Sequence, residues 1–282
     1  MQHLRFWGKA GGARLDEPGW HPLAYHNLDV AAVADVLLGA SPRKLRTIAR
    51  HLGTTPDRAR QILVALIALH DIGKFSKAFQ AKNADAWPSH CLGAYPGPLA
   101  GGRHDAVASQ IRGILELKNL FGPTFETWNN SDFDDLWHAI SGHHGRPRVE
   151  TIVKATGELP RACEDAARAF CTDIAKLFPQ DTAIPLPSLH DLTALTWHVA
   201  GLAVIADWIG SNRTWFPYRN PSLSLPEYWP QAVTHAERAI ARAGILPACV
   251  PPGVSAARLL PRGVAVDVAG GFDRAARGGN DV

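Results

Sequence analysis

The stretch Leu69-His70-Asp71-Ile72-Gly73-Lys74-Phe75 places a histidine and an aspartate side by side where a strongly apolar segment meets a glycine. The apolar segment predicts a helix over 56–70, in which Ile62, Leu66 and His70 follow at i, i+4 on one face. Burial of an unpaired polar group costs roughly 2–7 kcal/mol, and more for a charge. The pair therefore predicts either a divalent cation or a structural hydrogen bond, and further ligands elsewhere decide between them.

Length and composition describe an ordinary globular chain. Its 282 residues are 46% hydrophobic, enough for a substantial core in one large or two small domains. The net charge of +3 permits a polyanionic partner without requiring one. The four cysteines form no C-x-x-C pair, which favours reduced thiols and argues against a zinc finger. The start lacks an apolar signal segment, and the apolar run over 199–209 is short and contains Asp207, so we expect a cytoplasmic protein without membrane insertion.

Helical periodicity dominates and no alternating strand pattern is evident, so the predicted fold class is all-α. Residues 1–246 are expected to form one helical domain, and the Ala-, Gly-, Pro- and Arg-rich residues 247–282 a poorly ordered tail. No helix is predicted in the Pro-rich stretches over 83–103 and 217–230. Helices are predicted over 28–38, 43–52, 56–70, 104–121, 133–141, 161–177 and 189–209, the last with a capping box from Ser188 to Asp191.

Further candidate ligands occur where these helices begin or end. His26 and His104 each stand at the start of a predicted helix. His143 and His144 are adjacent, about 100° apart on a regular helix, and the flanking glycines permit the bend that joint use requires. Asp207 lies in a helix that is apolar on nearly all sides, where a carboxylate needs a cation or strong donors.

Each of these residues also has a structural interpretation. His26 alone would be a capping or core histidine, His104 a surface residue, and Asp207 a partner for an arginine. His21 is a less supported alternative to His26, and Asp105 forms a second His-Asp pair that lacks a preceding buried helix. Together, five imidazoles and two carboxylates favour a two-metal site. Without thiolates the metal is predicted to be Mn, Fe, Co, Ni or Zn.

Five motifs in this order resemble the HD nuclease domain of the type I CRISPR nuclease-helicase, within the HD metal-dependent phosphohydrolase superfamily. The resemblance runs from about residue 6 to residue 211. The motifs are Phe6-Trp7-Gly8-Lys9, Tyr25-His26-Asn27-Leu28-Asp29-Val30-Ala31-Ala32-Val33, Ala68-Leu69-His70-Asp71-Ile72-Gly73-Lys74-Phe75, Gly142-His143-His144-Gly145 and Ala206-Asp207-Trp208-Ile209-Gly210-Ser211.

The resemblance implies a helical HD-domain bundle with two metals in its core. Asp71 would be the central ligand, shared by a first metal on His26, His70 and Asp207 and a second on His104, His143 and His144. The implied substrate is single-stranded DNA, cut after the guide-RNA surveillance complex Cascade opens the target, with in-line attack on phosphorus by metal-activated water. Lys74 would add electrostatic support, the alternative being a snorkelling surface lysine.

Substrate contacts are a weaker prediction. Arg146, Arg148, Lys77, Lys82 and Arg213 flank the ligand motifs and are candidates for phosphate contacts. Trp208 or Trp215 would offer a stacking face to bases.

The chain departs from the family in lacking a G-x-x-x-x-G-K-[ST] phosphate loop. No ATP site is therefore predicted. We expect a separate HD subunit served by a helicase in trans, a chain cut before the helicase, or a homologue without that half.

Three functions remain open at this point. The favoured hypothesis is a metal-dependent endo- or exonuclease that degrades single-stranded DNA in CRISPR interference. The first alternative is a helicase-free homologue that binds Cascade as a regulator or competitor. The second alternative is an HD phosphohydrolase of small nucleotides.

Overall fold

The computed structural model describes residues 2–101, 103–144, 159–179, 181–246, 265–266 and 272–273. The chain divides into two units, Met1–Leu246 and Pro247–Val282. In the second unit, β3 (Ala265–Val266) pairs antiparallel with β4 (Phe272–Asp273). The other residues of the predicted poorly ordered tail lie outside the described residues, so its disorder stays a prediction.

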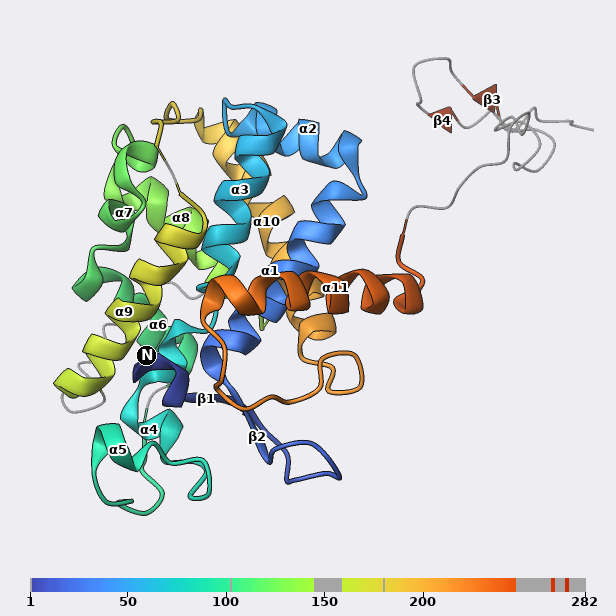
Figure 1. The fold of residues 1–282 in the computed structure, drawn as a ribbon. Coiled ribbons are helices and arrows are strands. Elements are labelled where there is room, and N and C mark those ends of the chain that lie inside the picture. The colour runs from blue at the N-terminus through green and yellow to red at the C-terminus, as the bar shows by residue number, and fades with distance from the viewer. Residues whose placement is uncertain are drawn as a thin grey trace, which may run out of the picture. The chain divides into compact units, whose positions relative to one another are not determined.

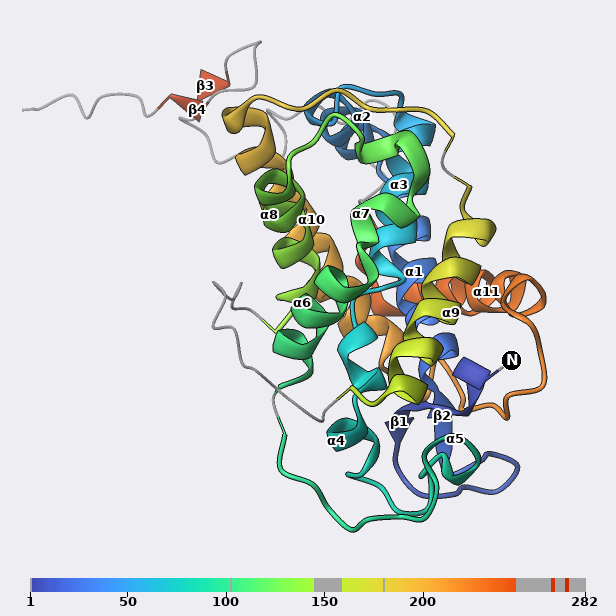
Figure 2. The same ribbon diagram turned by 90° about the vertical axis from the view of Figure 1, so that its left-hand side faces the viewer.

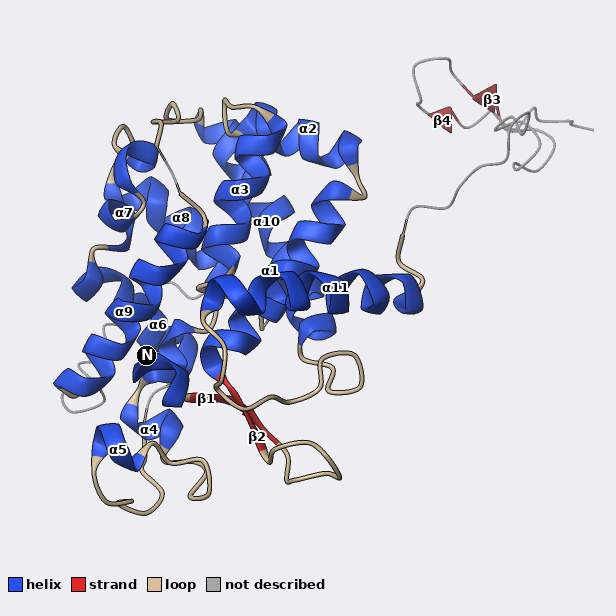
Figure 3. Cartoon of the chain, in the orientation of Figure 1, coloured by secondary structure: helices blue, strands red, loops and turns tan. Residues whose placement is uncertain are grey.

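The first unit is built from helices, which confirms the predicted all-α class (Figures 1 and 3). Its α-helices are α1 (Leu23–Gly39), α2 (Pro42–His51), α3 (Pro56–Ile67), α4 (Lys77–Gln80), α5 (Ser89–Leu92), α6 (His104–Leu115), α7 (Leu117–Leu120), α8 (Asn130–Ser141), α9 (Arg161–Leu177), α10 (Leu189–Gly210) and α11 (Leu225–Ala243). The described residues also include the 3-10 turns η1 (Gln2–Arg5), η2 (Ile72–Phe75) and η3 (Gly122–Phe125).

The centre of the bundle is formed by α1 and α3. Every residue of α1 from Leu23 to Ala34 is buried, and α3 is buried from Ile62 to its end. In the view of Figure 2, α8 and α10 lie on one side of this pair, and α9 and α11 on the other. A helix covered on all sides loses the one-sided apolar stripe of a surface helix. Burial of α1 on all sides therefore accounts for apolar residues on every face of the helix, and it brings the first-turn His26 into the core.

The predicted helices form, with corrections at their ends. α1 begins at Leu23 rather than residue 28, directly after Pro22. α3 ends at Ile67 because the next turn tightens, with the His70 amide donating to Ile67 O at 3.0 Å. The helix predicted over 104–121 breaks at Glu116, whose φ is +49°. Ser188 accepts the Asp191 amide at 3.1 Å, as the predicted cap requires.

Besides the one-turn helices α4 and α5, of which α5 lies in the stretch over 83–103 where no helix was predicted, two larger elements of the first unit were not predicted. The first is the hairpin of β1 (Trp7–Ala10) and β2 (Trp20–Pro22), antiparallel and too short to show an alternating pattern. The second is α11, which begins inside the Pro-rich stretch over 217–230. Its capping box joins Ser224 and Glu227, and Pro226 occupies the first turn, where a missing amide costs nothing.

α11 packs across α1 through a buried polar cluster (Figure 1). The Tyr228 hydroxyl donates to Asp29 Oδ1 at 2.8 Å, and His21 Nε2 lies 3.0 Å from Asp29 Oδ2. Tyr25 and Tyr228 stack with ring centroids 3.9 Å apart. Because His21 is committed to Asp29, it is excluded as the alternative to His26.

One described helix, α10, is long and apolar enough to cross a bilayer on length and composition alone. In the structure 44% of that apolar window is buried, against α1 and α8. We therefore describe α10 as a packed helix of the bundle.

Candidate metal centre

The His70-Asp71 pair lies in the tight turn between α3 and η2, buried to 1% exposure at each residue. His70 Nδ1 lies 3.0 Å from Ile67 O. A carbonyl oxygen only accepts, so Nδ1 carries a proton and Nε2 faces the interior of the cluster. His143 repeats this arrangement, with Nδ1 3.2 Å from Ile140 O. Such a backbone contact is what fixes the ring of a metal-binding histidine.

Close packing of η2 against α6 holds Asp71 near His104. A Cβ on Gly73 would stand 1.7 Å from His104 O, a backbone atom that cannot move aside cheaply. Only glycine permits this approach, so the glycine that follows the His-Asp pair is needed for the site to form.

The first group of candidate ligands comes from three separate elements. His26 belongs to α1, His70 and Asp71 to the turn after α3, and Asp207 to α10. Their ligand atoms all lie within 4.8 Å of one another. His26 Nε2 is 3.2 Å from Asp71 Oδ2, and His70 Nε2 is 3.3 Å from the same oxygen. Both Nε2 atoms are 3.7 Å from Asp207 Oδ1.

The second group consists of His104, His143 and His144, whose ligand atoms also lie within 4.8 Å of one another. α8 ends at Ser141, and the chain turns at Gly142, which supplies the bend that joint use of the adjacent histidines requires. His104 Nε2 is 2.8 Å from His144 Nε2. His143 is buried, His104 partly buried and His144 exposed, so this group faces the open side of the cluster.

Asp71 connects the two groups through its two oxygens. Oδ2 faces the first group, whereas Oδ1 lies 3.3 Å from His104 Nε2 and 3.7 Å from His143 Nε2. Asp71 Oδ1, His70 Nε2 and His143 Nε2 are buried without a well-directed hydrogen bond among the described residues. Buried polar atoms in folded proteins rarely lack a hydrogen-bond partner. The donor set therefore fits two divalent cations that share Asp71.

Charge in the cluster is balanced by protons and by one lysine. Burial raises the pKa of Asp71, but the nearby Lys74 and His70 outweigh it and hold that pKa well below its usual range. Burial lowers the pKa of His70, but Asp71 and Asp207 raise it to about 9. Burial lowers the pKa of His143 to about 4. A metal cation would take the place of the His70 proton at Nε2.

Lys74 is buried, with 6% of its surface exposed, so the alternative of a snorkelling surface lysine is wrong. Its Nζ lies 2.5 Å from Asp71 Oδ2 and 3.5 Å from Gly8 O. Buried Lys and Asp side chains are seldom found unpaired. Lys74 is therefore an integral member of the cluster, and its catalytic role stays a prediction.

The weaker substrate candidates have different outcomes. We correct the assignment of Arg213, because its guanidinium donates to Glu17 Oε2 at 2.9 Å and to Gly11 O and Gly12 O, and covers the Tyr218 ring. Trp208 is exposed on α10, and its role stays a prediction. Arg146 and Arg148 lie outside the described residues.

Sequence reasoning missed Lys9. This residue belongs to the quoted motif at residues 6–9 but received no role. In β1 its Nζ lies 4.0 Å from Asp207 Oδ1. Burial and the neighbouring Lys74 lower the pKa of Lys9. The signal that could have found it is a lysine in an otherwise apolar strand motif.

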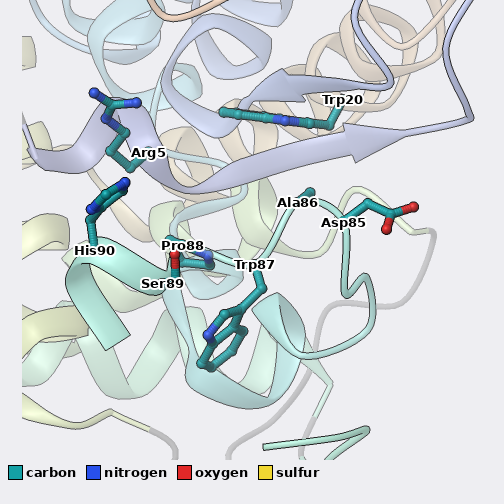
Figure 4. A pocket seen from close by; sticks show the side chains of 8 residues that line it. All are labelled: Arg5, Trp20, Asp85, Ala86, Trp87, Pro88, Ser89 and His90. Carbon is teal, nitrogen blue, oxygen red and sulfur yellow. The ribbon is translucent and has the colours of Figure 1, made fainter. Parts of the chain in front are cut away.

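A pocket also lies between β2 and the turn before α5 (Figure 4). Arg5, Trp20, Trp87 and His90 line it, and none of the candidate ligands does. The candidate metal centre is therefore separate from it.

Comparison with known proteins agrees with this geometry. The family model described as "Cas3, HD domain" matches residues 7–216. The chain belongs to the Cas3 HD-domain family. This membership confirms the resemblance inferred from the five motifs.

Two curated Cas3 proteins named CRISPR-associated endonuclease/helicase share 28% identity with this chain. The protein of Escherichia coli strain K12 aligns over 74% of this chain and 26% of its own length. That of Thermus thermophilus aligns over 86% of this chain and 25% of its own length. This chain thus spans about a quarter of the curated Cas3 proteins that it matches.

Solved Cas3 structures share the fold. A structure of the Thermus thermophilus Cas3 HD domain in the presence of Ni²⁺ matches with a TM-score of 0.61 at 26% identity, over 86% of this chain and 92% of that one. T. fusca Cas3 matches with a TM-score of 0.66 at 25% identity, over 89% of this chain and 28% of that one. A CRISPR RNA-guided surveillance complex in a pre-nicking state matches with a TM-score of 0.62 at 25% identity, over 86% of this chain and 29% of the matched chain.

Proposed function

We propose that this chain is a metal-dependent nuclease domain that cuts single-stranded DNA in type I CRISPR interference. The observation that carries the proposal is the pair of ligand groups on opposite oxygens of Asp71. Two cations held there would supply Lewis-acid activation of water and neutralise charge on a phosphodiester. Membership of the Cas3 HD-domain family supports the same chemistry.

The chain's own residues would hold the substrate beside this centre. His144 is exposed and His104 partly exposed, so a phosphate would approach the second group first. Lys74 and Lys9 stand on the other side, next to Asp71 and Asp207. Their ammonium groups are positioned to attract the non-bridging phosphate oxygens, and each would orient the backbone through a charge-assisted contact.

Single strands suit this site better than duplex. Six of the seven candidate ligands are buried or partly buried, so we expect the phosphodiester to reach them through a recess in the protein surface. A flexible single strand bends its backbone into such a recess, whereas duplex DNA is stiff over this distance. We accordingly propose that unwound target DNA is the substrate. The surveillance complex Cascade is the proposed partner that exposes it, with a helicase in trans as a further proposed partner.

The experiment is a cleavage assay on metal-depleted protein supplied with Mn²⁺, Fe²⁺, Co²⁺, Ni²⁺ or Zn²⁺. Linear and circular single-stranded DNA are expected to be cut with at least one metal, and blunt duplex without ATP is expected to be cut poorly. Cutting of the circle would identify endonuclease activity. Absence of cleavage with every metal would contradict the proposal.

Family membership does not favour the two alternative functions. A small-nucleotide phosphohydrolase predicts nucleotide turnover with no DNA degradation in the same assay. A regulator predicts capture by Cascade together with an inactive nuclease centre. Pull-down with Cascade, with and without target DNA, separates the regulator from the nuclease.

A further inference from the structure

α10 carries an exposed stripe that the metal centre does not use. Trp197 and Trp208 are 78% and 72% exposed, which is unusual for the largest apolar side chain. They are separated by three helical turns, about 16 Å along the axis and within about 20° of the same direction. Three further residues are exposed on this face: His190, which precedes Trp197, and Gly201 and Ile205, which lie between the two tryptophans. We call these five residues the α10 stripe.

The stripe is open along its middle. A Cβ added to Gly201 would meet no atom of the described residues within 4 Å, so the helix surface is open at this position between the two tryptophans. Asp207 precedes Trp208 and points about 100° away from it, towards the candidate metal centre. One end of the α10 stripe is therefore adjacent in sequence to a candidate ligand.

A basic helix lies beside the other part of the stripe. α2 packs through Leu45, Ile48 and Ala49, and its sequence contains no acidic residue. The outward side chains of α2 include four exposed cations, Arg43, Lys44, Arg46 and Arg50. None of the four forms an ion pair with any residue that the structure describes. A row of unneutralised cations favours a polyanionic partner.

Direct contacts join α2 to α10. The rings of His51 and His198 stack with centroids 6.0 Å apart, and His51 Nδ1 lies 2.8 Å from Asp191 Oδ1. Lys44 is close enough to His198 to act on its charge. Because His198 follows Trp197 and lies about 100° around α10 from it, we infer that the cations of α2 flank the Trp197 end of the α10 stripe.

We propose that this surface binds single-stranded DNA, with bases stacked on Trp197 and Trp208 and the backbone held by the cations of α2. The proposal rests on the nuclease function proposed above and extends it to a substrate track leading away from the metal centre. Exposed aromatic rings provide stacking faces for any base, and adjacent cations track the phosphates. A purely apolar partner would leave the α2 cations without a counter-charge, which is why we favour nucleic acid.

The test is binding of a labelled oligothymidylate, followed by fluorescence anisotropy in EDTA so that no cleavage occurs. Trp197→Ala is expected to weaken binding by roughly tenfold or more, and Trp197→Phe to retain much of it. A combined Arg43→Ser and Lys44→Ser variant is expected to weaken binding and to lower the slope of log Kd against log salt concentration by roughly one unit. The matched control is Arg161→Ser with Lys176→Ser, two exposed cations of α9, which should change neither quantity.

Unchanged affinity in Trp197→Ala, or equal effects of the α2 and α9 charge variants, would overturn the proposal. The proposal would also be overturned if these variants lost binding to anionic lipid vesicles while they bound oligothymidylate as the wild type does. That result would indicate a membrane-binding surface. Cleavage of a dinucleotide, too short to reach Trp197, tests the metal centre separately. If wild-type protein cuts the dinucleotide while Trp197→Ala binds oligothymidylate normally, the track fails and the nuclease stands. If oligothymidylate binding depends on Trp197 but no DNA is cleaved, the DNA-binding surface is supported and the nuclease function is contradicted.

Discussion

Asp71→Asn is expected to abolish DNA cleavage while the other six candidate ligands remain in place. Asp71 is the residue whose two oxygens face both ligand groups. The amide keeps the shape of the carboxylate but removes its charge and one acceptor oxygen. Loss of an outer partner of a metal ligand typically costs roughly 10–100-fold in activity, so loss of a shared ligand should cost about 10³-fold or more. Single-turnover cleavage of single-stranded DNA measures the effect.

Folding must be controlled in this experiment, because Asp71→Asn leaves the buried Lys74 ammonium without its partner. Removing one member of a buried ion pair costs about 3–5 kcal/mol. The double variant Asp71→Asn with Lys74→Met removes both charges and should recover stability without recovering activity. Asp105→Asn is the matched control, because Asp105 belongs to the second His-Asp pair but is bonded to Arg103 outside the cluster. Activity that survives in Asp71→Asn, or vanishes equally in Asp105→Asn, would contradict the account.

Lys74→Met should lower the rate of cleavage by roughly 100-fold without weakening metal binding. Lys74 Nζ lies 2.5 Å from Asp71 Oδ2, so in the metal-free protein the ammonium neutralises an oxygen that a cation would use. Removing the ammonium leaves that oxygen free for metal. If Lys74 contacts the phosphate of the substrate, Lys74→Met lowers the rate of cleavage and leaves the metal affinity unchanged.

Metal affinity and kcat of the same variant separate the two roles of Lys74. Unchanged or tighter Mn²⁺ binding with a lower kcat is the expected pair of results. The matched control is Lys118→Met, a partly buried lysine of α7 whose Nζ donates to Trp128 O outside the candidate centre. Unfolding or loss of metal binding in Lys74→Met alone would show that Lys74 only supports the structure.

Much of the candidate site could be predicted from the sequence because its ligands are polar residues in apolar surroundings. His70, Asp71 and Asp207 are conspicuous for this reason, and the structure buries all three. The adjacent histidines were predicted to need a bend, and α8 does end at Ser141, two residues before His143. The distribution of seven residues into two groups came from family resemblance, since no local pattern encodes which distant helices meet.

The failures have physical reasons. Arg213 looked like a phosphate contact because it flanks a ligand motif, but the side chain folds back onto Glu17, which lies far away in the sequence. α11 was missed because proline was read as a helix breaker, although Pro226 occupies the first turn, where its missing amide is harmless. Lys9 was missed because only the pairing of β1 with β2 brings it to Asp207.

The most direct test of a two-metal centre on Asp71 is the number of metal ions bound per chain. Metal-depleted protein is saturated with Mn²⁺, freed of excess ion and measured by elemental analysis beside two variants. The account predicts two ions for the wild type, one for His104→Ala, which loses a ligand of the second group only, and none for Asp71→Asn. Equal metal content in the wild type and in Asp71→Asn would contradict it.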